Sequence, residues 1–107
     1  MNKQQIINHI IEIEGGYVND PSDSGGETNY GITKQVALDN GYDGDMKDLS
    51  KDFAYQIYEK QYWNKLRADD YPIELAAKLV DMAVNLGVNR AARFFAKNRL
   101  ICLMMLV

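Results

Sequence analysis

The sequence predicts a mainly α-helical fold with an irregular glycine-rich loop or short hairpin after its first helix. Two observations lead to this prediction. Apolar residues recur at helical spacing in several segments, and the stretch from Glu14 to Thr33 holds five glycines, a proline and four carboxylates. Apolar residues make up 47% and charged residues 25% of the 107-residue chain, which is the ordinary mix of a compact globular domain.

The first helix is expected over residues 2–14, with Asn2 as its N-cap. Its buried face is expected to consist of isoleucines at helical intervals, namely Ile6, Ile7, Ile10, Ile11 and Ile13. Gly15 and Gly16 end this helix. The residues that follow, up to Gly26, are types that form tight turns, so they predict a loop.

Two helices are expected in the middle of the chain. Thr33 is expected to cap a short helix that ends near Asn40 and Gly41, where glycine can adopt the left-handed conformation. Ser50 is expected to begin a longer helix. The buried stripe of that longer helix is expected to contain Phe53, Ala54, Ile57, Tyr58, Tyr62 and Trp63.

Two further helices are expected in the C-terminal third. Pro72 suits the first turn of a helix that stops at Gly87, and Asn89 is expected to cap a last helix. The inward face of the helix before Gly87 is expected to comprise Leu75, Ala76, Leu79, Val80, Ala83 and Leu86. The last helix is expected to run through Ala92, Phe94 and Phe95.

Charge and cysteine content argue against several classes of function. The formal net charge of -3 does not favour nucleic acid as a partner. One histidine, His9, and one cysteine, Cys102, are too few for a Cys/His metal site, and we expect no metal or other cofactor. The N-terminus lacks the apolar run of a signal peptide, and the eight apolar residues 100–107 fall far short of the about 20 that span a bilayer.

The chemistry that the loop could carry centres on Glu14. The glycines after it leave room for a substrate to approach its carboxyl group, and a partly desolvated glutamate can stay protonated near neutral pH, as a general acid must. Asp20 and Asp23 follow on a chain that turns back, so a second carboxylate could face Glu14, and such a pair can cleave a glycosidic bond. The alternative is that both aspartates cap turn amides and that Glu14 is simply solvated.

Thr28 and the tyrosines of this stretch also allow two interpretations. The Thr28 hydroxyl could position an attacking water and Tyr30 could stack on a sugar face, yet both residues suit an ordinary strand-like segment. The other aromatic residues are interpreted as core or as the wall of a groove, namely Tyr17, Tyr55, Tyr58, Tyr62 and Trp63.

Three blocks of the sequence together resemble a known family. Residues 14–33 read EGGYVNDPSDSGGETNYGIT, residues 54–63 read AYQIYEKQYW, and residues 75–94 read LAAKLVDMAVNLGVNRAARF. In this order the blocks resemble glycoside hydrolase family 108, the phage endolysin and secretion-associated N-acetylmuramidases. The resemblance covers roughly residues 5–95.

The resemblance implies a lysozyme-like helical domain that hydrolyses the β-1,4 bond between N-acetylmuramic acid and N-acetylglucosamine in peptidoglycan. It implies that Glu14 is the catalytic acid. The pattern is also similar to phage lysozymes, in which a Glu is followed after eight residues by an Asp and after five more by a Thr. Here Asp23 keeps the first gap, but four residues separate Asp23 from Thr28. We therefore expect Asp23 to favour the developing positive charge or to orient water alongside Thr28. The residues expected to bind substrate are Tyr17, Asp20 and Tyr30.

The resemblance also implies a domain arrangement and partners. We expect a muramidase catalytic domain over residues 1–90 and the truncated start of a C-terminal peptidoglycan-binding region over residues 91–107, where the sequence departs from the family pattern. The expected protein is a monomer that can associate through its apolar tail. It is expected to be made in the cytoplasm without a signal peptide, released by a holin or similar partner, and active on peptidoglycan of the cell wall in the periplasm.

A second function stays open at this point. The same groove could belong to a catalytically weak or inactive peptidoglycan-binding or secretion-accessory protein. Retention of Glu14, Asp23 and Thr28 favours the enzyme. A plain helical interaction module would leave the glycines and carboxylates of the loop unexplained.

Overall fold

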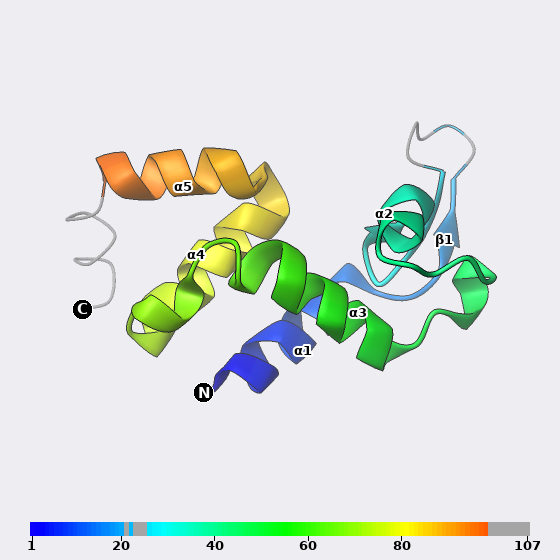
Figure 1. The fold of residues 1–107 in the computed structure, drawn as a ribbon, viewed down its shortest axis with the longest axis horizontal. Coiled ribbons are helices and arrows are strands. Elements are labelled where there is room, and N and C mark those ends of the chain that lie inside the picture. Colours follow the sequence, from blue (N-terminus) through cyan, green and yellow to red (C-terminus); the bar gives the residue numbers. More distant parts are fainter. Residues whose placement is uncertain (21, 23–25, 99–107) are drawn as a thin grey trace. The chain divides into compact units, whose positions relative to one another are not determined.

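The computed structural model describes residues 1–20, 22 and 26–98 (Figure 1). The chain divides into two compact units. Residues 7–57 form the hairpin unit, and residues 1–6 together with those from Tyr58 onward form the helical unit. The predicted class, mainly α with a short hairpin after the first helix, is confirmed. Asp23 and the apolar tail lie outside the described residues.

Helix α1 (Lys3–Glu14) begins and ends as its sequence predicts. Asn2 caps it, because the Gln5 N–H donates to Asn2 Oδ1 at 2.9 Å while the Asn2 N–H donates to Gln5 Oε1 at the same distance. Four of the five isoleucines are buried, at positions 6, 7, 10 and 11. The prediction for Ile13 is wrong: it is 67% exposed, because two residues beyond Ile11 a helix turns its side chain to the opposite side.

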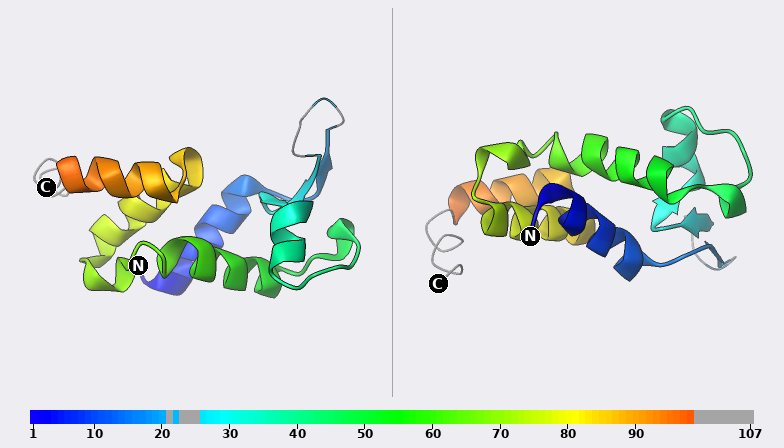
Figure 2. Two further views of the ribbon diagram at one scale, coloured as in Figure 1. Left: turned by 45° about the horizontal axis from the view of Figure 1, so that its top comes forward. Right: turned by 90° about the horizontal axis from the view of Figure 1, so that it is seen from below.

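The hairpin unit holds a three-stranded antiparallel sheet in the order β1 (Val18–Asn19), β2 (Glu27–Asn29), β3 (Ile32–Thr33). Figure 2 shows these short strands close to α2 (Lys34–Asp39), which follows β3 without a loop. Thr33 caps α2 as predicted, since its Oγ1 accepts the Val36 N–H at 3.2 Å.

A short 3-10 helix and a longer α-helix complete the hairpin unit. The 3-10 helix η1 (Met46–Asp48) precedes α3 (Lys51–Tyr58), whose start is marked by Ser50: the Ser50 Oγ accepts the Phe53 N–H at 3.1 Å. The buried residues of α3 within this unit are Ala54 and Ile57. Ser50 therefore begins this helix as predicted.

In the helical unit the chain continues from α3 into a π-helical segment, η2 (Glu59–Trp63), which the sequence does not predict. The Asn64 N–H bonds to the Glu59 carbonyl at 2.8 Å, five residues back. Trp63 is buried, and its indole N–H donates to Asp69 Oδ1 at 2.9 Å from the 3-10 helix η3 (Ala68–Asp70). Lys3 also forms an ion pair with Glu59 at 2.5 Å.

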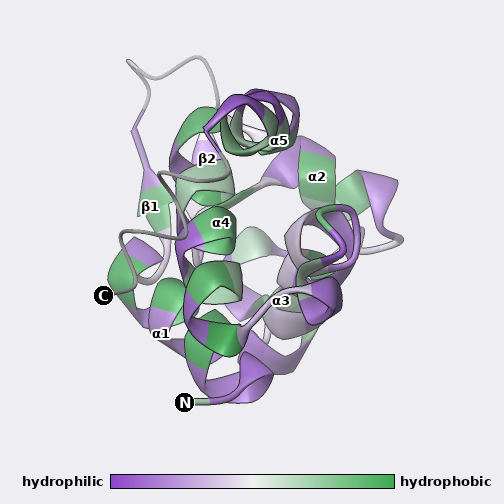
Figure 3. Ribbon diagram, turned by 90° about the vertical axis from the view of Figure 1, so that its left-hand side faces the viewer, coloured by the Kyte–Doolittle hydropathy of each residue, from purple (hydrophilic) through white to green (hydrophobic). Residues whose placement is uncertain are grey.

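The last two helices are α4 (Ile73–Leu86) and α5 (Val88–Lys97), which Figures 1 and 2 show doubling back on each other. Figure 3 shows the hydrophobic residues of α4 in green. Five of its predicted core residues are buried: Leu75, Ala76, Leu79, Val80 and Ala83. The prediction that Leu86 is buried is wrong, since it is 48% exposed at the last position of the helix.

The cap predicted for α5 is also wrong. Asn89 lies inside this helix, because Gly87 with φ of 93° reverses the chain in a single residue and serves as the boundary of both helices. Phe95 is buried against Tyr71 in an edge-to-face contact, with ring centroids 5.1 Å apart, whereas Phe94 is exposed. The boundary predicted between residues 90 and 91 falls inside α5, and the two-domain arrangement stays a prediction. Each helix of the described residues is too short or too polar to span a bilayer.

Candidate functional site

Glu14 is the last residue of α1 and its side chain is exposed. Gly15 ends the helix with φ of 82°, and its N–H donates to the Ile11 carbonyl at 3.1 Å, which is the single-bond form of a glycine C-cap. A Cβ placed on Gly15 or Gly16 would meet no atom within 4 Å. The Glu14 carboxyl group therefore stands at an open helix end, as the glycines led us to expect. The prediction that this carboxyl group is partly desolvated is wrong for the free chain, because its side chain is exposed.

Tyr30 lies at the tip of the hairpin between β2 and β3. Asn29 pairs with Ile32, so Tyr30 and Gly31 form a two-residue turn with φ of 54° and 78°. Such a turn usually carries Asn or Gly at its first position, because a bulky side chain with positive φ is strained. A tyrosine kept in a strained conformation is a feature often found at functional sites.

The sheet presents two different faces. Thr28 pairs with both Val18 and Thr33, and paired residues share a face of an antiparallel sheet. Glu27 pairs with Asn19 on the opposite face, because successive side chains of a strand alternate. Thr28 therefore lies on one face of the sheet, and Glu27 and Asn19 on the other.

Asp20 is exposed and takes part in a local turn. Its Oδ1 accepts the Ser22 N–H at 3.0 Å and the Ser22 hydroxyl at 2.7 Å. The side-chain hydrogen bond, followed by the backbone one, lowers the pKa of the Asp20 carboxyl. The arrangement agrees with the turn-capping interpretation of Asp20. Asp23 lies outside the described residues, so its distance from Glu14 is not defined.

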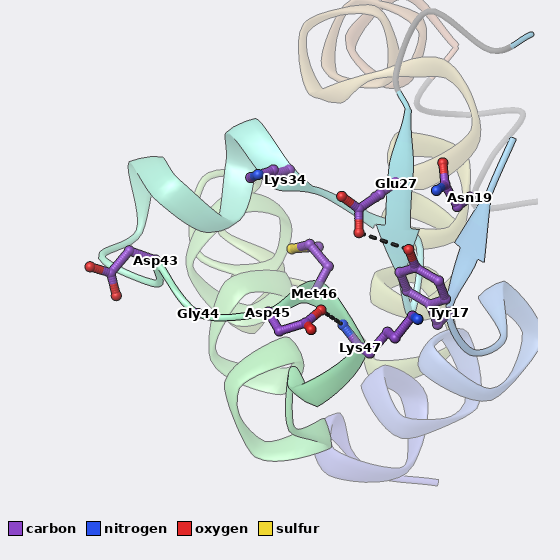
Figure 4. Close-up of a pocket in the computed structure, with 9 residues that line it drawn as sticks. All are labelled: Tyr17, Asn19, Glu27, Lys34, Asp43, Gly44, Asp45, Met46 and Lys47. Carbon is purple, nitrogen blue, oxygen red and sulfur yellow. Dashed lines mark hydrogen bonds between the residues drawn. The ribbon is translucent and has the colours of Figure 1, made fainter. Parts of the chain in front are cut away.

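A pocket of about 500 Å³ opens on the Glu27 face of the sheet (Figure 4). We call it the charged pocket. The residues that line it are Tyr17, Asn19, Glu27, Lys34, Asp43, Gly44, Asp45, Met46 and Lys47. Its volume falls in the range of small-ligand sites, and its side chains include three carboxylates and two amines.

Tyr17 joins the two charged sides of this pocket. Its hydroxyl donates to Glu27 Oε2 at 2.7 Å, and the Lys47 ammonium lies over its ring, 5.4 Å from the centroid. The hydrogen bond to Glu27 raises the pKa of the Tyr17 phenol above its ordinary value, and burial and the charges of Glu27 and Asp45 raise it further. The phenol thus stays a hydrogen-bond donor throughout the neutral range.

Hydrogen bonds hold the wall of the pocket opposite β2. The backbone N–H of Lys47 donates to Asp45 Oδ1 at 3.0 Å, and the Tyr42 hydroxyl donates to the backbone carbonyl of Asp45 at 2.5 Å. Asn29, the one buried polar residue among those described, donates from Nδ2 to the Met46 carbonyl at 2.8 Å and so ties β2 to η1. The pocket is therefore bounded by fixed elements.

Comparison with known proteins identifies the family. The model of the family Glycosyl hydrolase 108 matches residues 7–87. The chain belongs to glycosyl hydrolase family 108. A solved structure, that of SagA from Brucella abortus, is similar with a TM-score of 0.69 and 37% identity over 82% of this chain and 53% of that chain. The present chain thus spans about half the length of that structure. No curated protein matches the present chain.

Of the three residues of this family 108 chain predicted to bind substrate, Tyr17 lines the charged pocket, whereas Asp20 and Tyr30 are not among its lining residues. Thr28, predicted to be catalytic, lies on the opposite face of the sheet. No three His, Cys, Asp or Glu side chains of the described residues are grouped so as to hold a metal ion.

Sequence reasoning missed the charged residues of the pocket, namely Glu27, Lys34, Asp43, Asp45 and Lys47. One signal could have identified Glu27: Asn19 and Glu27 flank a turn-rich segment, as partners in a hairpin do. Residues 43–47 were not identifiable, because their position depends on the hydrogen bond between Asn29 and Met46, which joins segments far apart in sequence.

Proposed function

We propose that this chain is a peptidoglycan hydrolase that cleaves the β-1,4 bond between N-acetylmuramic acid and N-acetylglucosamine. The observation that supports this most directly is the family 108 match over residues 7–87, which includes Glu14 at an open helix end. The Glu14 carboxyl donates its proton to the glycosidic oxygen, and the C1–O bond breaks to leave an oxocarbenium-like centre. Water adds to C1 and its proton returns to a carboxylate.

The remaining roles follow from position. Asp23 stabilises the positive charge at C1 or orients the attacking water together with Thr28. Because Glu14 is exposed in the free chain, the water around its carboxyl group is displaced by the bound sugar itself. Tyr30, at its strained turn on the hairpin tip, packs on a sugar ring of the substrate.

The proposal extends to where the chain acts. We propose that it reaches the periplasm after release by a holin or similar partner and degrades the cell wall there as a monomer, without metal or cofactor. The reaction requires only proton transfer and charge stabilisation by carboxylates.

The test is release of reducing ends and muropeptides from purified peptidoglycan. Glu14→Gln should lower the rate at least about 100-fold, since general acid catalysis contributes that much or more. Glu12→Gln, a second exposed glutamate of α1, is the matched control and should keep the parent rate. Circular dichroism confirms that both variants are folded. Equal rates for Glu14→Gln and the parent would refute the proposal, and binding to sacculi without any release would favour the accessory protein instead.

A further inference from the structure

The lining of the charged pocket includes none of the residues to which the hydrolysis proposed above gives a role, and its side chains indicate a ligand of another kind. We propose that it binds a peptide that carries both amine and carboxylate groups, namely the stem peptide of peptidoglycan. The identification of the ligand as the stem peptide depends on the proposed function. The inference that the ligand carries both positive and negative charges depends only on the residues of the pocket.

The pocket is poorly suited to a neutral sugar. Sugars are usually held by an open aromatic face, yet the one aromatic residue in its lining, Tyr17, has the Lys47 ammonium over its ring and its hydroxyl on Glu27. Met46, the largest apolar residue of the lining, is only 2% exposed. What remains available to a ligand is mainly charge.

Both signs of charge are present and available. Lys34 is exposed and forms no ion pair with any residue of the described chain. On the other side, Glu27 accepts one hydrogen bond from Tyr17, and Asp45 accepts one from the Lys47 backbone, so each carboxylate keeps acceptor sites for a ligand ammonium. A ligand with one charge sign would leave the other set of side chains unpaired, whereas a zwitterion pairs with both.

The pocket is also formed before any ligand binds. Its far wall is fixed through Asp45 and through the bond from Asn29 to the Met46 carbonyl. Gly44 fits closely against the Tyr42 ring, where a Cβ would come within 2.9 Å of ring atoms. Because little ordering is needed on binding, even a few charge-assisted hydrogen bonds can give measurable affinity.

The pocket and Thr28, one of the proposed catalytic residues, lie on different faces of the sheet. The pocket lies on the Glu27 face of the sheet, whereas Thr28 lies on the opposite face. Peptide binding and glycan hydrolysis can therefore be measured independently.

The experiment is an NMR titration of the full chain with synthetic L-Ala-γ-D-Glu-L-Lys, which has free amines and free carboxylates. Three comparison probes are the same peptide with acetylated amines, the same peptide with amidated carboxylates, and neutral chitotetraose. The intact peptide should shift the amides of Tyr17 and residues 43–47 most strongly. Each blocked peptide should bind roughly fivefold more weakly than the intact peptide, because losing one partly exposed charge pair lowers the affinity by about this factor.

Two substitutions assign the charges. Lys34→Gln should weaken the intact and amine-acetylated peptides by roughly fivefold but leave the amidated peptide unaffected. Glu27→Gln should weaken the intact and carboxylate-amidated peptides by roughly fivefold but leave the amine-acetylated peptide unaffected. The amide oxygen of the new glutamine can still accept the hydrogen bond from the Tyr17 hydroxyl. Lys51→Gln, an exposed lysine of the same unit outside the pocket, should change no affinity.

The outcomes separate the two proposals. If no peptide shifts these amides, or if chitotetraose shifts them as strongly, the inference is overturned whatever the hydrolytic activity. If the two substitutions weaken all probes alike, the assignment of charges is overturned. If the peptide binds as expected while peptidoglycan releases no reducing ends, hydrolysis is refuted and the zwitterion site stands.

Discussion

Glu14 occupies a position where its charge is unfavourable to the helix that carries it. It is the last residue of α1, next to the unpaired carbonyls and the negative end of the helix dipole. A negative charge there opposes helix stability, whereas Asp52, in the first turn of α3, lies at the favourable end. The acid at position 14 therefore does not contribute to the stability of α1.

The helix dipole predicts opposite effects on stability for two isosteric substitutions. Glu14→Gln should raise the free energy of unfolding by about 0.3 kcal/mol, and Asp52→Asn should lower it by about the same amount, because both sites are exposed. Chemical denaturation at low and high salt measures both changes, which should shrink as salt screens the dipole. A loss of stability in Glu14→Gln would contradict this account.

Tyr17 should show its environment in its titration. Its pKa is raised chiefly by the hydrogen bond to Glu27, so the neutral phenol stabilises the folded state fully at pH values below the unfolded pKa of about 10. That stabilisation is lost as the pH rises through the higher folded pKa. The difference between the tyrosinate absorbance of the parent and of Tyr17→Phe isolates this residue, and Glu27→Gln should move its titration to lower pH. An unchanged titration in Glu27→Gln would contradict the assigned cause.

At the scale of elements, the junction of α1 with the loop depends on one glycine more than on its neighbour. Gly15 and Gly16 are both surrounded by open space, but only Gly15 has a positive φ. Gly15→Ala should therefore lower the free energy of unfolding by about 1 kcal/mol through backbone strain. Gly16→Ala should be neutral or slightly stabilising, because it restricts the unfolded chain. Thermal unfolding of the two variants checks this, and equal effects would show that φ is not the cause.

The elements that sequence predicts well are those marked by local chemistry. Asn2, Thr33 and Ser50 form the hydrogen bonds expected of caps, since a cap involves only the next three residues. Gly87 also ends α4 as expected, but Asn89 was misassigned, because nothing local indicates that one glycine serves two helices. The π-helical turn at Glu59–Trp63 is likewise not marked in the sequence.

In the candidate site too, local features could be predicted from the sequence, whereas features that depend on distant contacts could not. The motif around Glu14 identifies a helix end with open glycines, which is local information. The separation of Thr28 from Tyr17 depends on strand register, and a shift of one residue would exchange the faces. The pocket beyond Glu27 depends on the contact between Asn29 and Met46, and neither residue type indicates that contact in the sequence.

At the scale of the whole molecule, the chain passes between its two units inside helices. Residues 6 and 7 of α1 belong to different units, and so do residues 57 and 58 of α3. If one unit unfolded alone, each of these helices would keep only part of its length, and short isolated helices are marginal in water. Both units should therefore unfold in one cooperative transition.

Two probes on different units test this cooperativity. Trp63, the single tryptophan, reports the helical unit by fluorescence, and the amide signals of residues 27–33 report the hairpin unit by NMR. Ala54→Gly, buried in the hairpin unit, costs about 1 kcal/mol in helix propensity, with an added cost for the lost methyl group. It should lower the denaturant midpoint seen by both probes equally, and Ala76→Gly in the helical unit should do the same. If each substitution moved only the probe of its own unit, the helices that connect the units would not couple them.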